Sequence, residues 1–150
     1  MSKTYVSVAL RRLVQTRAKS LCEYCLIREE DTYFGCQVDH IISEKHGGST
    51  QESNLAYACS YCNRNKGSDI GSIVSETQQF CRFFNPRIDR WPDHFRLDSI
   101  RIIALTTIGE VTARILDFNH VDRLIERAEL AALGEYPSRT ALAVISKENL

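Results

Sequence analysis

The chain has 150 residues, of which 43% are hydrophobic and 25% are charged, as is usual for a globular domain. A chain of this length buries roughly two thirds of its unfolded surface, so we expect a single domain over residues 1–150. Lysine plus arginine and aspartate plus glutamate both number 19, which excludes a protein that coats nucleic acid through a large excess of positive charge.

Apolar stretches in the sequence are short. None approaches the 18 or so residues that a membrane span needs, and the first ten residues lack the apolar stretch of a secretion signal. These features predict a cytoplasmic protein.

Four of the six cysteines form two CxxC pairs, Cys22/Cys25 and Cys59/Cys62. Without a secretion signal, paired CxxC motifs indicate metal ligands before disulfides. Zinc prefers four soft ligands in a tetrahedron, and two CxxC turns supply four thiolates, so the pattern predicts a closed structural Zn²⁺ site without chemistry of its own. The alternatives are a redox CxxC or four unconnected thiols.

The other cysteines, Cys36 and Cys81, are predicted to be buried as small hydrophobic residues. Three tyrosines beside the CxxC pairs, Tyr24, Tyr57 and Tyr61, are interpreted as shielding the metal rather than stacking on bases.

Residue periodicity predicts the elements around the cysteines. Residues 6–20 show the spacing of an amphipathic helix, whose basic side chains are interpreted as a solvated face. Residues 32–35 and 37–42 are strand-like and predict a short hairpin. Residues 52–57 are expected to form one helical turn, and residues 61–66 a short helix.

Residues 80–92 combine prolines, aromatics and arginines, which predicts an ordered irregular segment anchored by Phe83 and Trp91. Apolar and polar side chains alternate within residues 95–105, which predicts two short strands.

Two helices are predicted near the end of the chain. Thr107 is expected to cap a helix over residues 108–118, and residues 121–133 form a second helix that Gly134 ends. The last dozen residues are expected to be peripheral. The second helix is predicted to bury an apolar face made of Leu124, Ile125, Ala128, Ala131 and Ala132.

Chemistry-bearing residues fall between and just after the CxxC pairs. In chain order they are Asp39-His40-Ile41-Ile42, Gly47-Gly48, Asn54-Leu55, Cys62-Asn63 and Lys66-Gly67. Their order and spacing resemble the HNH endonucleases, specifically the branch with a four-cysteine zinc site. The resemblance implies an α+β protein with a ββα-metal (HNH, His-Me finger) core over about residues 10–70, an N-terminal helix and a C-terminal strand/helix extension over about residues 71–140.

The resemblance also assigns roles. His40 is expected to act as general base, because an imidazole is largely free to accept a proton at neutral pH. Asp39 and Asn63 are expected to supply oxygen ligands to a catalytic Mg²⁺ or Mn²⁺. Asn54 is expected to hydrogen-bond loop backbone and so hold the strand that carries His40. Adjacent side chains of a strand point to opposite faces, so Asp39 and His40 need a bend near the strand end to serve one site.

Basic residues near this region are candidates for contacts with double-stranded DNA, the expected partner. Lys66, Arg64 and Arg87 are assigned to nucleic-acid binding, although Lys66 is equally interpretable as a solvated surface lysine. His46, His94 and His120 lack the surrounding motif and are interpreted as structural or solvent-exposed.

Two positions depart from the commonest family pattern. Asn63 stands where histidine is frequent in the family, which disfavours a softer catalytic metal. Ser43 stands where the family often has a proline directly after the Asp-His-Ile-Ile stretch, so the loop lacks the rigidity of that proline.

The first functional hypothesis is a metal-dependent HNH endonuclease that hydrolyses DNA phosphodiester bonds, leaving 5′-phosphate and 3′-hydroxyl ends as the resemblance implies. The alternative is a catalytically silent, zinc-stabilised module for binding nucleic acid or protein, which the zero net charge favours. A third hypothesis is a small regulator or defence component whose C-terminal helices dock a partner that supplies DNA specificity. A homodimer or a protein partner is accordingly among the expected partners.

Overall fold

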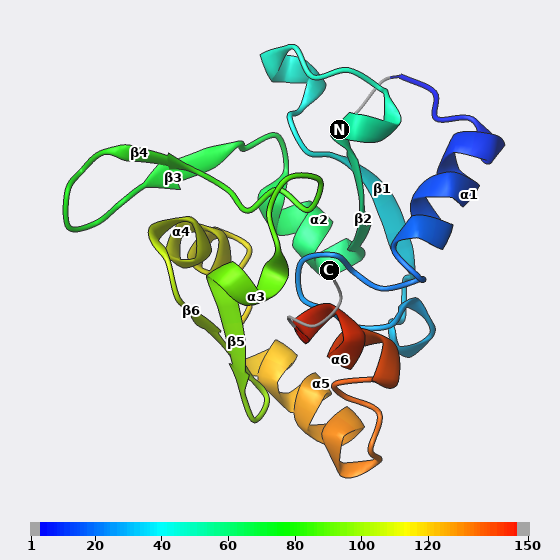
Figure 1. Cartoon of the computed structure of the whole chain (residues 1–150), viewed down its shortest axis with the longest axis vertical. Helices are drawn as coiled ribbons and strands as arrows, with labels where there is room; N and C mark the ends of the chain where they lie inside the picture. Colours follow the sequence, from blue (N-terminus) through cyan, green and yellow to red (C-terminus); the bar gives the residue numbers. More distant parts are fainter. Residues whose placement is uncertain (1–3, 147–150) are drawn as a thin grey trace.

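The computed structural model describes residues 4–146, which form six α-helices and three two-stranded antiparallel sheets (Figure 1). Helices and strands are mixed along the chain, so the predicted α+β class is confirmed. Among the helices of residues 4–146, none has the length and hydropathy needed to cross a bilayer.

Helix α1 spans Val8–Arg17 and confirms the predicted N-terminal helix with shorter ends. The side chain of Ser7 caps it by accepting a hydrogen bond from the backbone N–H of Leu10. Arg17 donates to the backbone carbonyls of Glu52 and Leu55, at 3.0 and 2.7 Å. The interpretation of the basic residues as a solvated face is therefore wrong for Arg17, which holds α1 against the start of strand β2.

Strand β1 (Cys36–His40) pairs with strand β2 (Leu55–Cys59), in register from Cys36 opposite Cys59 to His40 opposite Leu55. The predicted hairpin between residues 32–35 and 37–42 is therefore wrong. Residues 32–35 form no strand, because Gly35 takes a left-handed φ of +76° and the aromatic side chains before it face solvent.

Strand β2 lies where a helical turn was expected. Only Glu52–Asn54 form a 3-10 turn, and the next five residues are all buried in the strand. A short apolar run that is buried on both faces has no period of two, so periodicity cannot separate it from a helix. Helix α2 (Ser60–Lys66) follows at once, confirming the predicted short helix and completing a β1–β2–α2 unit.

A second hairpin, β3 (Gly71–Ile73) and β4 (Phe80–Arg82), projects from one side of the molecule (Figure 1). Its strands were not predicted, since each has only three residues. Cys81 in β4 is half-buried rather than buried, whereas Cys36 is buried as expected.

Residues 83–90 are irregular and lead into the short helix α3 (Trp91–His94). Phe83 and Trp91 are buried, so both predicted anchors are confirmed. The indole N–H of Trp91 donates to the carbonyl of Tyr24 at 2.9 Å, which joins this segment to the first CxxC loop.

Strands β5 (Phe95–Asp98) and β6 (Arg101–Ala104) form the predicted pair. Helix α4 spans Thr107–Ile115 and is capped by Thr106 rather than Thr107, with the hydroxyl of Thr106 accepting from the N–H of Gly109.

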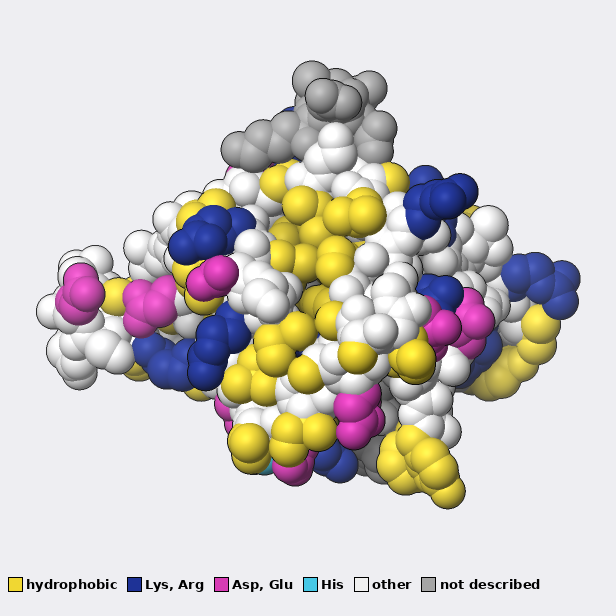
Figure 2. All heavy atoms as spheres, turned by 90° about the horizontal axis from the view of Figure 1, so that it is seen from below, with side chains coloured by type: hydrophobic (Ala, Val, Ile, Leu, Met, Phe, Trp, Pro, Cys, Tyr) yellow, Lys and Arg dark blue, Asp and Glu magenta, His cyan; other side chains and the backbone are white. Residues whose placement is uncertain are grey.

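Helix α5 (Val121–Ala132) confirms the predicted helix, but its predicted buried face is wrong. The residues it buries are Arg123 and Arg127, while Ile125 is 54% exposed. Figure 2 looks at the molecule from the side of α5 and α6 and shows hydrophobic side chains gathered on that face. Hydrophobic periodicity predicts the helix correctly here but points to the wrong side of it.

Helix α6 spans Arg139–Ile145 and packs against α3. Its cap, Ser138, and Ala141 in its first turn are both buried. Of residues 139–146 only Ala141 is buried and the others are exposed or half-buried, so this part of the last dozen residues lies at the surface; residues 147–150 lie outside the described part of the chain.

Candidate functional site

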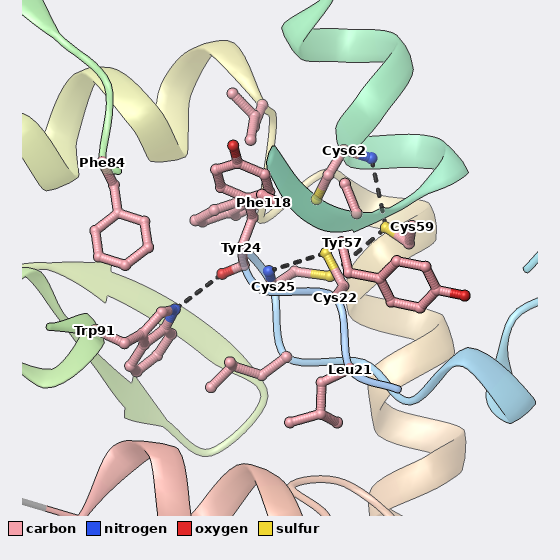
Figure 3. Close-up of a cluster of buried hydrophobic side chains, with 14 of the residues drawn as sticks. Leu21, Cys22, Tyr24, Cys25, Tyr57, Cys59, Cys62, Phe84, Trp91 and Phe118 are labelled. Atoms are coloured by element: carbon pink, nitrogen blue, oxygen red, sulfur yellow. Dashed lines mark hydrogen bonds between the residues drawn. The ribbon is translucent and has the colours of Figure 1, made fainter. Parts of the chain in front are cut away.

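Four buried cysteines form the most compact cluster of metal-ligating side chains in residues 4–146. The sulfurs of Cys22, Cys25, Cys59 and Cys62 all lie within 4.8 Å of one another, and the Cys25 and Cys59 sulfurs are 3.8 Å apart (Figure 3). Tetrahedral zinc with Zn–S bonds of about 2.3 Å places its sulfurs about 3.8 Å apart. The four thiols are unpaired as disulfides, so the cluster fits a zinc ion.

Local backbone geometry aims the two CxxC pairs at one point. The N–H of Cys25 approaches the sulfur of Cys22 at 3.5 Å, and the N–H of Cys62 approaches that of Cys59 at 3.4 Å. The first CxxC loop is joined to β2 because the N–H of Glu23 donates to the carbonyl of Tyr57 at 2.8 Å. Two turns far apart in sequence thus meet at the end of the β1–β2 sheet.

The tyrosines beside the cysteines have distinct surroundings. Tyr24 and Tyr57 are buried, and the hydroxyl of Tyr24 donates to a carboxylate oxygen of Asp39 at 2.9 Å. Tyr61 is half-buried, and its ring lies under the guanidinium of Arg123. Burial, with the negative Asp39 beside it, raises the pKa of the Tyr24 hydroxyl well above its usual value, so Tyr24 remains a donor to that carboxylate.

His40 ends strand β1 and is only 6% exposed. Its Nε2 atom lies 2.9 Å from the hydroxyl of Thr50 and 3.2 Å from a carboxylate oxygen of Glu44. Both partners belong to the loop that joins β1 to β2. Neither partner was predicted, although Glu44 stands only four residues after His40, in the loop that follows the strand.

The same loop is held closed by Asn54. Its side-chain oxygen accepts from the N–H of Ile42 at 2.9 Å, and its amide nitrogen donates to the carbonyls of Ile42 and Ser49. Gly48 allows this approach, because a Cβ atom there would lie 1.6 Å from the carbonyl oxygen of Ile42. The side chain of Asn54 therefore contacts loop backbone beside the strand that carries His40.

Replacing Asn54 with alanine is expected to lower the free energy of unfolding by about 1–3 kcal/mol, because three hydrogen bonds to loop backbone, each worth roughly 1 kcal/mol, are lost. Urea denaturation monitored by circular dichroism measures this change. The exposed neighbour Ser53, replaced with alanine, is the matched control and should change little. A loss below about 0.5 kcal/mol for the Asn54 variant would show that the loop closes without this side chain.

Asp39 and Lys66 form a buried ion pair. Both oxygens of the carboxylate lie 3.2 Å from Nζ of Lys66, which also donates to the carbonyl of His40 at 2.9 Å. The side chains of Lys66 and Asp39 are 1% and 4% exposed. Burial raises the pKa of the Asp39 carboxyl, and the Lys66 ammonium and the Tyr24 hydroxyl oppose that rise.

The structure therefore corrects the assignment of Lys66 to nucleic-acid binding. Its ammonium lies inside the protein, against Asp39 and the backbone of His40, because the buried carboxylate requires a positive partner. Arg64, two residues earlier, is exposed beside Tyr61 and stays a candidate for phosphate contact.

Arg87 is the second basic residue that the structure places internally. Its guanidinium forms an ion pair with Glu23 and donates to the carbonyl of Leu55 at 3.0 Å. Burial raises the pKa of the Glu23 carboxyl while the positive Arg87 opposes that rise. Because the guanidinium is engaged by these partners, Arg87 fixes the first CxxC loop to β2 rather than facing DNA.

The two expected ligands of a catalytic cation have different partners. Asn63 donates to the side-chain oxygen of Gln37 at 2.6 Å, whereas Asp39 contacts Lys66 and Tyr24. The β1–β2 ladder is regular through His40, so the expected bend is absent from that ladder, and Asp39 and His40 point to opposite faces. Gln37 and Asp39 are two residues apart and share the face that α2 covers.

The remaining histidines have ordinary surroundings. His46 is exposed, His94 bonds the hydroxyl of Thr106, and the ring of His120 caps α5 by accepting from the N–H of Asp122.

Comparison with protein families identifies this region. The family model of the HNH endonucleases matches residues 22–69, from the first cysteine of the cluster to just beyond α2. Neither the comparison with curated proteins nor that with solved structures gave a match. The match covers the strand with His40, the loop closed by Asn54 and all four clustered cysteines, so residues 22–69 of this chain are similar to the HNH endonucleases.

Proposed function

We propose that this protein is an endonuclease that hydrolyses phosphodiester bonds in DNA with the help of Mg²⁺ or Mn²⁺. The observation that carries the proposal is the environment of His40: inside the region that matches the HNH endonucleases, its ring is held by Thr50 and Glu44. A general base needs a ring held in a fixed orientation, and this loop supplies the two contacts that hold it.

The proposed reaction begins when His40 accepts a proton from the attacking water. The carboxylate of Glu44 and the hydroxyl of Thr50 both contact Nε2 and hold the ring in place. A bound divalent cation would supply positive charge for the phosphate and for the departing 3′ oxygen. Asn54 keeps the loop, and thereby both partners of His40, in place.

The ligands proposed for that cation are Asp39 and Asn63. Asp39 points to the face of β1 that α2 covers and His40 to the other face, so the proposal requires the end of β1 to turn when the cation and DNA bind. A carboxylate and an amide oxygen are the hard donors that Mg²⁺ and Mn²⁺ prefer. The carboxylate of Asp39 already pairs with a positive group, the ammonium of Lys66. This pairing supports the proposal that Asp39 binds a cation. The cation and Lys66 would then compete for, or share, the same oxygens.

Replacing Lys66 with methionine is expected to lower the free energy of unfolding by about 3–5 kcal/mol, because Asp39 remains buried without a partner. If Asp39 binds the cation, millimolar Mn²⁺ should raise the melting temperature of this variant more than that of the wild type.

Thermal melts with and without Mn²⁺ test both points, and replacing the exposed Lys45 with methionine is the control. A Lys66 variant as stable as the wild type would contradict the role of the ion pair. Equal shifts by Mn²⁺ would contradict Asp39 as a cation ligand.

Cleavage of supercoiled plasmid DNA tests the function itself. The zinc-loaded protein should nick or linearise the plasmid in Mg²⁺ or Mn²⁺ and leave it intact without a divalent cation. Single-stranded DNA and RNA of the same sequence measure the preference for the duplex. Failure to cleave any of these substrates would contradict the proposal.

A second candidate is a zinc-stabilised binding module without turnover. The observation that favours it is the closed state of the centre, with His40 only 6% exposed and Asp39 neutralised by Lys66. For this module, gel-shift binding to DNA would persist in the absence of cleavage and would be unaffected by alanine at His40.

A further inference from the structure

Helix α5 buries two arginines and exposes much of its apolar face. Arg123 and Arg127 are 4% and 0% exposed, whereas Val121 and Ile125 are 60% and 54% exposed. Burying a guanidinium is costly unless acceptors or negative charge surround it. The partners of these two arginines therefore explain which side of α5 faces the protein.

Arg123 points at the cysteine cluster. Its Nη2 atom lies 3.0 Å from the sulfur of Cys25, and Nη1 and Nη2 each lie 3.7 Å from the sulfur of Cys59. The guanidinium also covers the ring of Tyr61, 4.4 Å from its centroid, and its Nε lies 3.3 Å from a carboxylate oxygen of Glu126. Two of the four sulfurs thus face a buried positive charge.

Charge explains this contact. Zinc bound by four thiolates carries two net negative charges, and these sulfurs are buried, where solvent cannot screen the excess. A guanidinium that donates to two of the sulfurs offsets part of that charge through charge-assisted hydrogen bonds. Neutral thiols are weak hydrogen-bond acceptors, so they would do little to stabilise a buried guanidinium.

We infer that Arg123 is an outer-sphere partner of the four-cysteine metal centre, donating to the thiolates of Cys25 and Cys59, so that metal binding and docking of α5 stabilise each other. The inference rests on the metal centre and is independent of the proposed nuclease activity.

A second contact joins the same cysteine to the C-terminal region. The hydroxyl of the buried Tyr136 donates to the carbonyl of Cys25 at 2.9 Å. Arg28, just after the first CxxC loop, also pairs with Glu135 at 3.2 Å. The segment from α5 to the start of α6 therefore contacts the first CxxC loop at three places: the sulfur of Cys25, the carbonyl of Cys25 and the side chain of Arg28.

Arg127 provides a matched control, because it lies one helical turn further along the same buried face. Its guanidinium donates to the carbonyls of Ile100 and Phe118 at 2.7 and 2.8 Å and to the side chain of Asn119. These acceptors belong to the β5–β6 turn and to the turn between α4 and α5. Replacing Arg127 therefore removes an equally buried arginine while leaving the contacts of Arg123 to the sulfurs in place.

The test is the affinity for Zn²⁺, measured by competition with a chromophoric chelator, for the wild type and the variants R123M, R123K and R127M. Loss of an outer-sphere partner typically weakens a metal site by about 10–100-fold, so R123M should lose affinity in that range. R123K keeps the charge without the planar fork and should fall between R123M and the wild type. R127M should bind Zn²⁺ within about twofold of the wild type, since its contacts are to backbone and amide oxygens.

Substitution with Co²⁺ gives a readout that a purely structural role would not move. The thiolate-to-metal charge-transfer band of R123M should shift relative to the wild type, and that of R127M should not. Zinc affinity of R123M within twofold of the wild type, or an equal loss in R127M, would overturn the inference. Should R123M fail to fold, R123Q is judged by the same criterion.

Discussion

Replacing Cys59 with serine is expected to unfold the β1–β2–α2 unit or lower its melting temperature by tens of degrees. Apparent binding free energies of structural zinc are about 10–16 kcal/mol, comparable with the whole stability of a domain. Cys59 also ends β2 and begins α2, where its sulfur accepts from the N–H of Cys62. Circular dichroism melts, with zinc content determined by mass spectrometry, measure the effect.

The control for Cys59 is Cys81, which lies outside the cluster in the short hairpin. Its serine variant should keep one zinc ion per chain and melt within a few degrees of the wild type, roughly the shift of a 1 kcal/mol change. A Cys59 variant that keeps its zinc and its stability would contradict the metal centre, and with it the outer-sphere role of Arg123.

Replacing His40 with alanine is expected to reduce the rate of DNA cleavage by about 10²–10⁴-fold, the usual contribution of a positioned general base. The fold should remain, because the partners of His40 lie in the loop and the β1–β2 ladder is made by backbone groups. Gel analysis of plasmid cleavage at saturating enzyme gives the rate without a contribution from turnover.

His46 offers the matched control for His40, since it lies in the same loop and is exposed. Its alanine variant should cleave at the rate of the wild type. Equal losses in the two variants would mean that the loop as a whole, rather than the imidazole of His40, determines activity.

The cysteine cluster of this chain was easier to predict than its architecture. Two CxxC pairs at fixed spacing constrain four side chains to one point, so the sequence alone predicts the cluster of Cys22, Cys25, Cys59 and Cys62. Strand β2 was missed because a fully buried run of five residues has no alternation.

Which basic side chains are buried, and which partners they contact, could not be predicted from the sequence. Lys66, Arg87 and Arg123 are each buried against a negative partner that is distant in sequence, at Asp39, Glu23 and the cysteines respectively. Sequence gives the number of charges but not which of them meet in the fold. The same limit explains α5, whose buried face is chosen by the acceptors around its two arginines rather than by hydrophobicity.

The opposite orientations of Asp39 and His40 were foreseen as a consequence of strand geometry, but the bend expected to reconcile them is absent from the ladder. The negative charge of the buried Asp39 is compensated by Lys66, which lies 27 residues later in the chain. The effect of Mn²⁺ on the melting temperature of the Lys66 variant therefore tests whether Asp39 is a cation ligand.

The proposed nuclease activity depends on His40, which lies in the region similar to the HNH endonucleases. Its most direct test is a single-turnover cleavage assay on supercoiled plasmid in Mn²⁺, comparing the wild type with H40A and H46A, each verified to carry one zinc ion. The account predicts cleavage by the wild type and H46A and a loss of at least about 10²-fold in H40A. Cleavage by H40A at the rate of the wild type, or no cleavage by any folded, zinc-loaded protein, would contradict it.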